Sequence, residues 1–422
     1  MRNLKSRYEL VTITATVVGA VIGSGVFFKA ESLARITCGN VAASIVAWMT
    51  GAAVMLLCLS AFMEITKAEG ESDLCFISKN ILGYGFSTLV GTFMSLVYYP
   101  SLVSVLSYLC ARYTLLSVGL EGNFLLCGIL ALLLLATNLW QNAFAMNFSG
   151  KFQLVTTFLK LIPLFLMIVL GISGGFARGT LHKNFSAETI IPFHKAFFPA
   201  VTATLFAYEG WISAAGIGAK SENAGKKLPL ALLAGGFIIA SVYILYYLGI
   251  TGAVETKILI NYGSDGIRTA FYNIVGKWGN LLTLFVAVSC LGALNALAMG
   301  LVNANKSFHK NAPRSTFSLG VVTSSLWLLW VFCNRENHGG KLWFDSTELP
   351  VVTIYALYIP LFLNSFRRER RRIKKALYTG GIVSSVFVLV CGFIAHSGEV
   401  VSYLCILTSI MLAGSLLHKK TG

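Results

Sequence analysis

The stretch GAVIGSGVF, Gly19 to Phe27, interrupts the first long apolar segment of the chain. Three glycines and a serine fall within seven of its residues, and glycine disfavours an unbroken helix. Irregular backbone at membrane depth survives only where protein buries it or where it faces a water-filled cavity, because lipid cannot satisfy the freed N–H and C=O groups. The stretch therefore predicts a broken helix beside a cavity in the middle of a membrane.

The overall composition agrees with a membrane location. The 422 residues are 56% hydrophobic and only 12% charged, with a mean hydropathy of +0.74, which excludes a soluble domain of ordinary composition. Apolar stretches of about 20 residues, the length that a bilayer requires, recur along the whole chain. We expect an all-α integral membrane protein with about twelve spans, formed by a single polytopic domain over residues 1–422. The spans are predicted near residues 9–29, 41–64, 86–110, 122–140, 152–172, 193–217, 229–253, 279–303, 316–333, 346–366, 377–395 and 399–417.

The net charge of +16 follows the membrane topology and does not indicate nucleic-acid binding. With the amino terminus inside, 21 of the 33 Lys and Arg residues lie in inside segments and 11 in outside segments, while Lys160 lies within a span. This bias predicts that both termini are cytoplasmic. The run RRERRRIKK, Arg367 to Lys375, is the strongest orienting cluster, and we interpret it as a topology anchor that touches anionic lipid headgroups.

Cysteine and histidine give no sign of a metal site, a cofactor or an enzyme. The nine cysteines occur singly in apolar runs, without a CxxC pair, and the six histidines form no HExxH or similar ligand pattern. We therefore expect neither a disulfide framework nor metal-dependent hydrolysis.

Lys160 is the most informative single residue. It lies about eight residues from one end of its apolar segment and twelve from the other, which places its Cα at least about 12 Å from either end. A lysine at this depth costs several kcal/mol (about 3 or more) unless it faces an aqueous cavity or binds backbone carbonyls. A functional role is therefore predicted, and the alternative is a helix that starts later than we place it.

A second interruption, YEGW at residues 208–211, lies in the sixth predicted span. Glu209 stands there in mid-span beside Gly210. Breaks in the first and the sixth of the spans predict two inverted repeats of five spans with a binding site between the breaks. The repeats would cover about residues 9–172 and 193–366, with two extra helices at about 377–417. The alternative is an ordinary kinked helix that buries Glu209 as a polar residue.

Three aromatic residues and one loop are further candidates for the site. Tyr98 and Tyr99 precede Pro100, and Tyr355 lies in the tenth span, so these tyrosines could form a pocket wall, although aromatic residues at helical spacing more often serve packing. The polar segment from Val254 to Asn280 is expected to be the longest outside loop, either a lid over the site or a plain connection.

Six stretches together resemble a known superfamily. They are VGAVIGSGVFFKA (18–30), AFMEI (61–65), FLKLIPLFLMIVLGI (158–172), ATLFAYEGWISAAG (203–216), KKLPLA (226–231) and SCLGALNA (289–296). In this order they resemble the amino acid-polyamine-organocation superfamily, and within it the prokaryotic branch of the L-amino acid transporter family, of the serine/threonine exchanger type. The likeness runs from about Leu10 to Phe308. It implies two intertwined inverted five-helix repeats, broken helices 1 and 6, two extra helices and alternating-access transport of amino acids across a bacterial inner membrane.

The resemblance also implies roles for individual residues. The backbone amides of four consecutive residues, Ile22, Gly23, Ser24 and Gly25, would bind the substrate carboxylate, which agrees with the preference of helix N-termini for anions. Lys160 would stand where sodium-coupled relatives hold a sodium ion, and its contacts to the first break would link occupancy to gating. The carbonyls that would receive the α-ammonium group belong to Val17, Val18, Phe206, Ala207 and Tyr208. Tyr208 and Trp211 would act as a gate or side-chain wall.

The sequence departs from the family pattern at three places. The double glycine after the second span is missing around Glu71 to Leu74, Lys220 stands where an acidic residue is common, and Asn303 stands where an arginine is common. All three lie toward the cytoplasmic face, so they affect inward gating and coupling more than the amino acid site.

The function predicted from the sequence is sodium-independent exchange of small or medium neutral L-amino acids. Glu209 leaves two alternatives open, a proton-coupled symporter and an exchanger of cationic amino acids. A transporter-like sensor or a channel is the alternative from another class, but the chain has no soluble output domain and no carbonyl-lined filter motif. The partners expected are an amino acid and membrane lipid; the sequence does not indicate an oligomeric state or the particular amino acid.

Overall fold

The computed structural model describes residues 14, 18–19, 21–69, 73–120, 122–187, 192–211, 224–309, 312–333 and 345–421. Within these ranges every regular element is a helix. Two of the residues predicted to matter, Val17 and Lys220, lie outside them, as do Glu71 and Ser72.

Nine helical stretches in the described ranges are long and apolar enough to cross a membrane. They are Val41–Glu69, Tyr84–Ser117, Phe124–Phe144, Lys151–Ala177, Leu233–Ala253, Asp265–Lys306, Pro313–Cys333, Glu348–Arg368 and Arg372–Ala395. Three further helices, α2 (Gly25–Ile36), α11 (Phe193–Tyr208) and α20 (Val400–Thr421), belong to the remaining predicted spans. The prediction of an all-α membrane protein with about twelve spans is thus confirmed for the described part of the chain.

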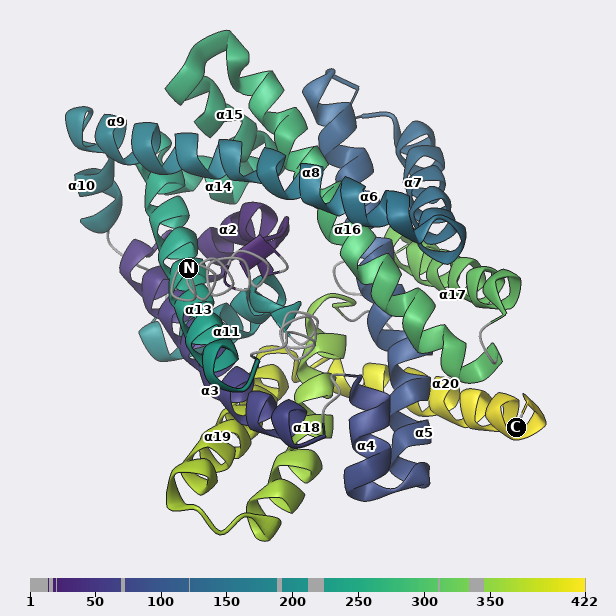
Figure 1. Ribbon diagram of the computed structural model, residues 1–422. Coiled ribbons are helices and arrows are strands. Elements are labelled where there is room, and N and C mark those ends of the chain that lie inside the picture. The colour runs from purple at the N-terminus through teal and green to yellow at the C-terminus, as the bar shows by residue number, and fades with distance from the viewer. Residues whose placement is uncertain are drawn as a thin grey trace, which may run out of the picture.

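The two short helices α2 and α11 lie near the centre of the molecule (Figure 1). They contact each other, and α11 also contacts α3 (Val41–Glu69). Two long helices, α13 (Ala224–Ala253) and α16 (Gly279–His309), are arranged around them. The helices that are interrupted in mid-membrane are therefore shielded from lipid by unbroken ones, which the unsatisfied backbone groups at their ends require.

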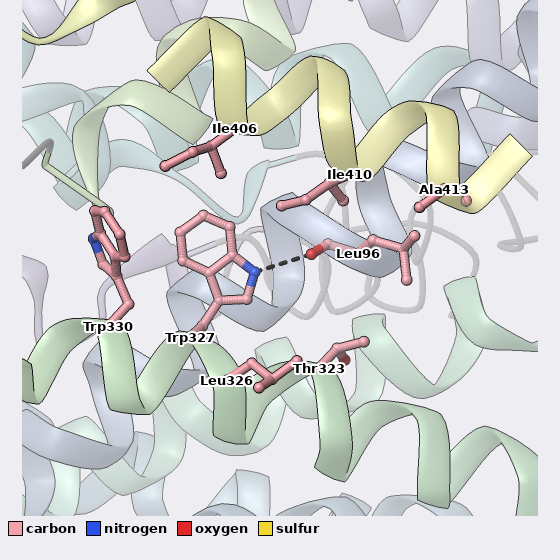
Figure 2. Close-up of a pocket in the computed structure, with 9 residues that line it drawn as sticks. Leu96, Thr323, Leu326, Trp327, Trp330, Ile406, Ile410 and Ala413 are labelled. Carbon is pink, nitrogen blue, oxygen red and sulfur yellow. Dashed lines mark hydrogen bonds between the residues drawn. The ribbon is translucent and has the colours of Figure 1, made fainter. Parts of the chain in front are cut away.

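The third span contains a π-helical turn with an identifiable cause. The span consists of α5 (Tyr84–Phe93), η1 (Met94–Tyr98) and α6 (Tyr99–Ser117). In a regular helix the N–H of residue 100 would bond the carbonyl of Leu96, but Pro100 has no N–H. The indole nitrogen of Trp327, on α17 (Pro313–Cys333), donates to this carbonyl instead at 2.9 Å. Figure 2 shows this bond beside an apolar pocket of about 290 Å³ between α17 and α20.

The fifth span is also irregular. It consists of α8 (Met146–Leu166), η2 (Met167–Gly171) and α9 (Ile172–Ala177). At η2 it packs closely on α13, because a Cβ at Gly171 would lie 2.3 Å from the carbonyl oxygen of Gly249. These glycines permit backbone-to-backbone contact between the two helices.

The predicted outside loop is helical, which corrects the expectation for Val254 to Asn280. The segment forms α14 (Thr256–Tyr262), α15 (Ser264–Val275) and the 3-10 turn η3 (Gly276–Trp278) before α16 begins. α15 is strongly amphipathic, burying Ile267, Ala270 and Phe271. An i, i+3, i+4 spacing of apolar residues within a polar segment is the pattern of a surface helix, so the mixed polarity indicates a half-buried helix and not a loop.

The remaining helices complete the bundle. α4 (Leu74–Leu82) is capped by Asp73, whose carboxylate accepts the N–H groups of Cys75 and Phe76 at 2.7 and 3.0 Å. Such a cap stabilises a helix N-terminus by about 1 kcal/mol. α7 is Phe124–Phe144 and α10 is Thr180–Phe185. α18 (Glu348–Arg368) and α19 (Arg372–Ala395) form a hairpin.

Candidate functional site

The first break lies where the glycine-rich stretch predicts it. Helical geometry ends after Val21, and Gly23 and Ser24 form a bend before α2 begins at Gly25. Ser24 is the cap of α2, and its side chain makes no capping hydrogen bond. The first N–H groups of α2 therefore lack the usual side-chain partner, and together with the positive end of the helix dipole they suit an anion.

The second break follows directly after α11. Glu209 has an extended backbone with φ −64° and ψ 163°, and Gly210 has a φ of +100°. A residue with a side chain rarely adopts that φ, so Gly210 is what allows the chain to turn here. Trp211, the next residue, is fully buried.

The two breaks touch each other. A Cβ at Gly25 would lie 2.6 Å from the Cα of Ala207, so only glycine permits this approach. On α13, the hydroxyl of Tyr243 lies 3.0 Å from the carbonyl oxygen of Val21 and 2.8 Å from that of Ala207, so its one proton is shared between these two acceptors. Tyr243 thus joins the two interrupted helices through their freed backbone groups. It was not among the predicted site residues.

Lys160 lies beside the first break. The residue is on α8 and is only 1% exposed, and its ammonium nitrogen donates to the carbonyl oxygen of Gly19 at 2.6 Å. Gly19 also packs tightly on α8, since a Cβ there would be 2.9 Å from a methyl carbon of Thr157. Lys160 is thus deeply buried, and of the two surroundings that the sequence left open, an aqueous cavity or backbone carbonyls, the structure shows a backbone carbonyl. Its ammonium group lies on the helix segment that leads into the first break.

The carboxyl group of Glu209 is buried beside aromatic side chains. The hydroxyl of Tyr98 donates to one of its oxygens at 2.7 Å, and its other oxygen has no hydrogen-bond partner among the described residues. Tyr98 is the last residue of η1, so the π-helical turn sets the position of its ring. Tyr355 and Tyr358 of α18 also lie close to Glu209. Tyr358 packs edge-on against Trp211 with ring centroids 5.6 Å apart.

Other predicted site residues have different surroundings. The ring of Tyr99 packs on Gly300 of α16, where an added Cβ would lie 2.4 Å from a ring carbon. The carbonyls of Val18 and Phe206 already accept the N–H groups of Ile22 and Glu209, at 2.8 and 3.2 Å. The hydroxyl of Tyr208 donates to the carbonyl of Trp48 at 2.9 Å. Asn303, on the expected inner side, accepts a hydrogen bond from Lys306 at 2.8 Å.

A cavity of about 770 Å³ opens at the other end of α2. Its lining includes Phe28, Lys29, Arg35, Arg112 and His396. The rings of Phe28 and Phe206 meet edge to face with centroids 5.3 Å apart. Lys29 lies above both rings, with its nitrogen 5.9 and 5.7 Å from their centroids.

A network of charged residues stands in this cavity. The nitrogen of Lys29 is 2.5 Å from one carboxylate oxygen of Glu348, and Nε2 of His396 is 3.0 Å from the other. Nδ1 of His396 is 3.2 Å from Glu399. Burial alone would lower the pKa of His396, but the hydrogen bonds to these two carboxylates outweigh it and raise the pKa to about 10. For Asp345 burial would raise the pKa, yet the charges of Lys29 and His396 hold it below its ordinary value.

Sequence reasoning missed this network and also Tyr243. Lys29 falls at the end of a predicted span, where a lysine is ordinary, and its partner Glu348 is 319 residues away. The only usable signal for Tyr243 was the placement of three tyrosines, 243, 246 and 247, on one face of an apolar helix.

Comparisons with known proteins agree with this architecture. The profile of the family described as amino acid permease matches residues 8–416. The serine/threonine exchanger SteT of Bacillus subtilis is 26% identical over 392 residues, which cover 89% of this chain and 86% of that protein. The human cystine/glutamate transporter is 24% identical over 311 residues, which cover 69% of this chain and 58% of that transporter. These similarities confirm the family resemblance inferred from the six stretches.

A solved structure has the same fold. The crystal structure of MhsT in complex with L-phenylalanine superimposes with a TM-score of 0.64 at 14% identity, covering 91% of this chain and 98% of MhsT. The predicted fold class, with its broken helices 1 and 6, is therefore confirmed.

Proposed function

The chain belongs to the amino acid permease family, and we propose that it is a sodium-independent exchanger of small or medium neutral L-amino acids that works by alternating access. As a member of this family it is a multi-pass membrane transporter of amino acids. The exchange mode is supported by the likeness to SteT, which is named as an exchanger of serine and threonine. The excess of Lys and Arg in alternate segments supports a cytoplasmic location of both termini, and the likeness to the exchanger of Bacillus subtilis supports a bacterial cytoplasmic membrane.

The proposed substrate site lies between the two breaks. The amides of Gly23, Ser24 and Gly25 bind the substrate carboxylate at the N-terminus of α2, where the helix dipole favours negative charge. The N–H of Ile22 is already bonded to the carbonyl of Val18. The α-ammonium group binds carbonyl oxygens at the end of α11, where no helical turn follows Tyr208 and the carbonyl of Ala207 has a lone pair left beside the hydroxyl of Tyr243. The aromatic residues Tyr98, Tyr208, Trp211 and Tyr355 form the wall around the side chain.

Sodium independence rests on one observation, the bond from Lys160 to the carbonyl of Gly19. An ammonium group at this depth supplies a fixed positive charge to the freed carbonyl, which is the interaction that a bound cation would otherwise provide. No cation then has to be transported to hold the break in its substrate-binding form. Because the bond joins α8 to the first broken helix, a movement of that helix has to stretch or break it, which gives substrate occupancy a route to gating.

Counterflow tests this function. Proteoliposomes loaded with 10 mM unlabelled serine, threonine, alanine or leucine, about tenfold or more above ordinary transporter KM values, are diluted into labelled amino acid, in sodium chloride or in choline chloride. We expect uptake that is accelerated by internal substrate and is equal in the two salts. Uptake that requires a sodium gradient, or that ignores the internal amino acid, would refute the proposal.

A second candidate function follows from Glu209. A buried carboxylate whose only side-chain partner among the described residues is a tyrosine hydroxyl is costly to ionise, so this group either carries a proton or receives a cationic substrate. A Glu209→Gln variant distinguishes the readings. Loss of lysine or arginine transport with neutral amino acids unaffected supports a cationic substrate. Loss of pH-driven accumulation with counterflow retained supports proton coupling. If both are unchanged, Glu209 serves packing and the neutral exchanger stands alone.

A further inference from the structure

The turn that joins α18 to α19 exposes an unusual density of positive charge. Five arginines in or beside it, Arg367, Arg368, Arg370, Arg371 and Arg372, are all exposed. In the described part of the chain none of them forms an ion pair. Figure 1 shows the turn at the far end of the α18–α19 hairpin, away from α15.

The one acidic residue of the turn does not neutralise these arginines. The carboxylate of Glu369 accepts the backbone N–H groups of Arg370 and Arg371 at 2.8 and 2.9 Å. These backbone bonds, that to Arg371 first, lower the pKa of Glu369 and keep it ionised. Glu369 therefore shapes the turn, while the five arginine side chains remain exposed.

An apolar side chain stands among the charges. Ile373 is 80% exposed, between Arg372 and Lys374. Both neighbouring helices are long and apolar enough to span a membrane, so the turn lies where headgroups meet acyl chains. An isoleucine exposed at that depth is buried by lipid, while guanidinium groups bind phosphate oxygens in a bidentate manner.

The turn is fixed to the transport bundle. The nitrogen of Lys374 is 2.7 Å from a carboxylate oxygen of Glu64, near the end of α3. The guanidinium of Arg368 donates to the carbonyl of Ile81 on α4 at 3.4 Å. A molecule bound by the turn is thereby held against α3 and α4.

We propose that the turn from Arg367 to Lys375 is a binding site for an anionic phospholipid, whose phosphate is bound by the exposed arginines and whose acyl chains surround Ile373. The arginines supply the complementary charge and the isoleucine selects a lipid over a soluble anion. This goes beyond orientation by positive charge, because it assigns a defined site on α18, α19, α3 and α4. The placement of this lipid in the inner leaflet rests on the proposed membrane topology.

A lipid titration tests the site. Dioctanoyl phosphatidylglycerol is added to the purified full-length protein in a neutral detergent, and the melting temperature is followed, because a ligand of the native state raises it. Dioctanoyl phosphatidylcholine and inorganic phosphate are the comparison probes. We expect a saturable rise with phosphatidylglycerol alone. An equal rise with phosphate at the same concentration would assign the site to a free anion and overturn the lipid, and an equal rise with phosphatidylcholine would overturn the role of charge.

Two matched variants locate the effect. R370Q/R371Q/R372Q removes three charges from the turn, whereas K151Q/K306Q/R314Q removes three from dispersed positions on other helices at the same side. Each Lys or Arg near an anionic surface contributes about fivefold, so we expect the turn variant to bind phosphatidylglycerol on the order of 100-fold more weakly and the dispersed variant to bind it normally. Equal losses in the two variants would overturn the site.

Ile373→Ser tests insertion without a change of charge. We expect roughly tenfold weaker binding of phosphatidylglycerol, since an aliphatic side chain is no longer transferred from water. Unchanged affinity would overturn the placement of Ile373 among the acyl chains. Because these titrations contain no amino acid, their failure is distinguishable from a failure of the counterflow experiment.

Discussion

Two buried lysines, Lys29 and Lys160, show how the same charge is held in two ways. They are 3% and 1% exposed. Lys29 is paired with the carboxylate of Glu348 at 2.5 Å, whereas Lys160 binds the carbonyl oxygen of Gly19 and has no acidic partner among the described residues. A paired charge can be kept for structure, but an unpaired one at membrane depth is retained at a cost and marks function. The pair joins α2 to α18, and the lone lysine acts on the break itself.

The largest effect is expected for Lys160→Met. The substitution keeps much of the side-chain volume but removes the charge that binds Gly19, so counterflow should fall at least about 100-fold, the size typical of a lost essential contact in a low-dielectric site. Insertion and monodispersity should be unchanged, because burying an uncharged side chain relieves a desolvation cost. Lys151→Met, at an exposed position of the same helix, is the matched control. Activity of Lys160→Met within threefold of the wild type would remove Lys160 from the mechanism.

The next effect concerns the paired lysine and appears in stability. Lys29→Gln leaves the carboxylate of Glu348 buried with His396 alone, and breaking a buried pair costs about 3–5 kcal/mol. The double variant Lys29→Gln/Glu348→Gln should recover part of this loss. Unfolding in detergent measures the free energy of unfolding of the single and the double variant. Lys183→Gln is the control, because Lys183 and Glu255 form an exposed pair and such pairs contribute at most about 1 kcal/mol. If the double variant loses more free energy of unfolding than the single variants Lys29→Gln and Glu348→Gln lose together, the two side chains do not stabilise the fold as a pair.

The difference between the two lysines also explains what could be predicted from the sequence. Lys160 stands in the middle of an apolar run, so burial follows from position alone. Lys29 stands at a span end, and its partner Glu348 is 319 residues distant. No local pattern relates two such residues, so only the fold brings them together.

The same reasoning applies to the breaks and to the outer segment. Glycine clusters break helices wherever they occur, so Gly23, Gly25 and Gly210 were readable in the sequence. The contact of the two breaks through Tyr243 cannot be predicted from the sequence, because an apolar helix does not indicate which carbonyl group a tyrosine hydroxyl will contact. The mixed polarity of the segment from Val254 to Asn280 predicts a loop when it is averaged over the segment, whereas the apolar stripe of α15 has the period of a helix.

His396 makes the paired lysine's network depend on pH. Its pKa in the folded protein is about 10, above the value of about 6.5 for an unfolded chain. The stabilisation is therefore complete below about pH 6.5 and is lost as the pH rises toward 10. His396→Gln should lower stability by a few kcal/mol (about 2–4) at pH 6 and leave it unchanged above pH 10.

Melting temperatures of the wild type and His396→Gln across this range measure the effect. The exposed His182→Gln serves as control. A constant difference between the two proteins from pH 6 to 10.5 would show that the imidazole acts by packing and not by charge.

The smallest effect is expected at Tyr243, which, like Lys160, holds the first break through a backbone carbonyl but carries no charge. Tyr243→Phe removes the hydroxyl whose proton is shared between the carbonyls of Val21 and Ala207. A neutral hydrogen bond contributes about 1 kcal/mol, so counterflow should fall roughly fivefold.

The matched control for this change is Tyr246→Phe, one helical turn away. The buried hydroxyl of Tyr246 has no hydrogen-bond partner among the described residues, so its removal should be neutral or slightly stabilising. If Tyr243→Phe instead abolished transport as Lys160→Met does, the break would depend on every donor to its carbonyls and not on charge. A fivefold loss of counterflow in Tyr243→Phe beside a 100-fold loss in Lys160→Met would mean that the charge of Lys160 keeps the first break in its substrate-binding form.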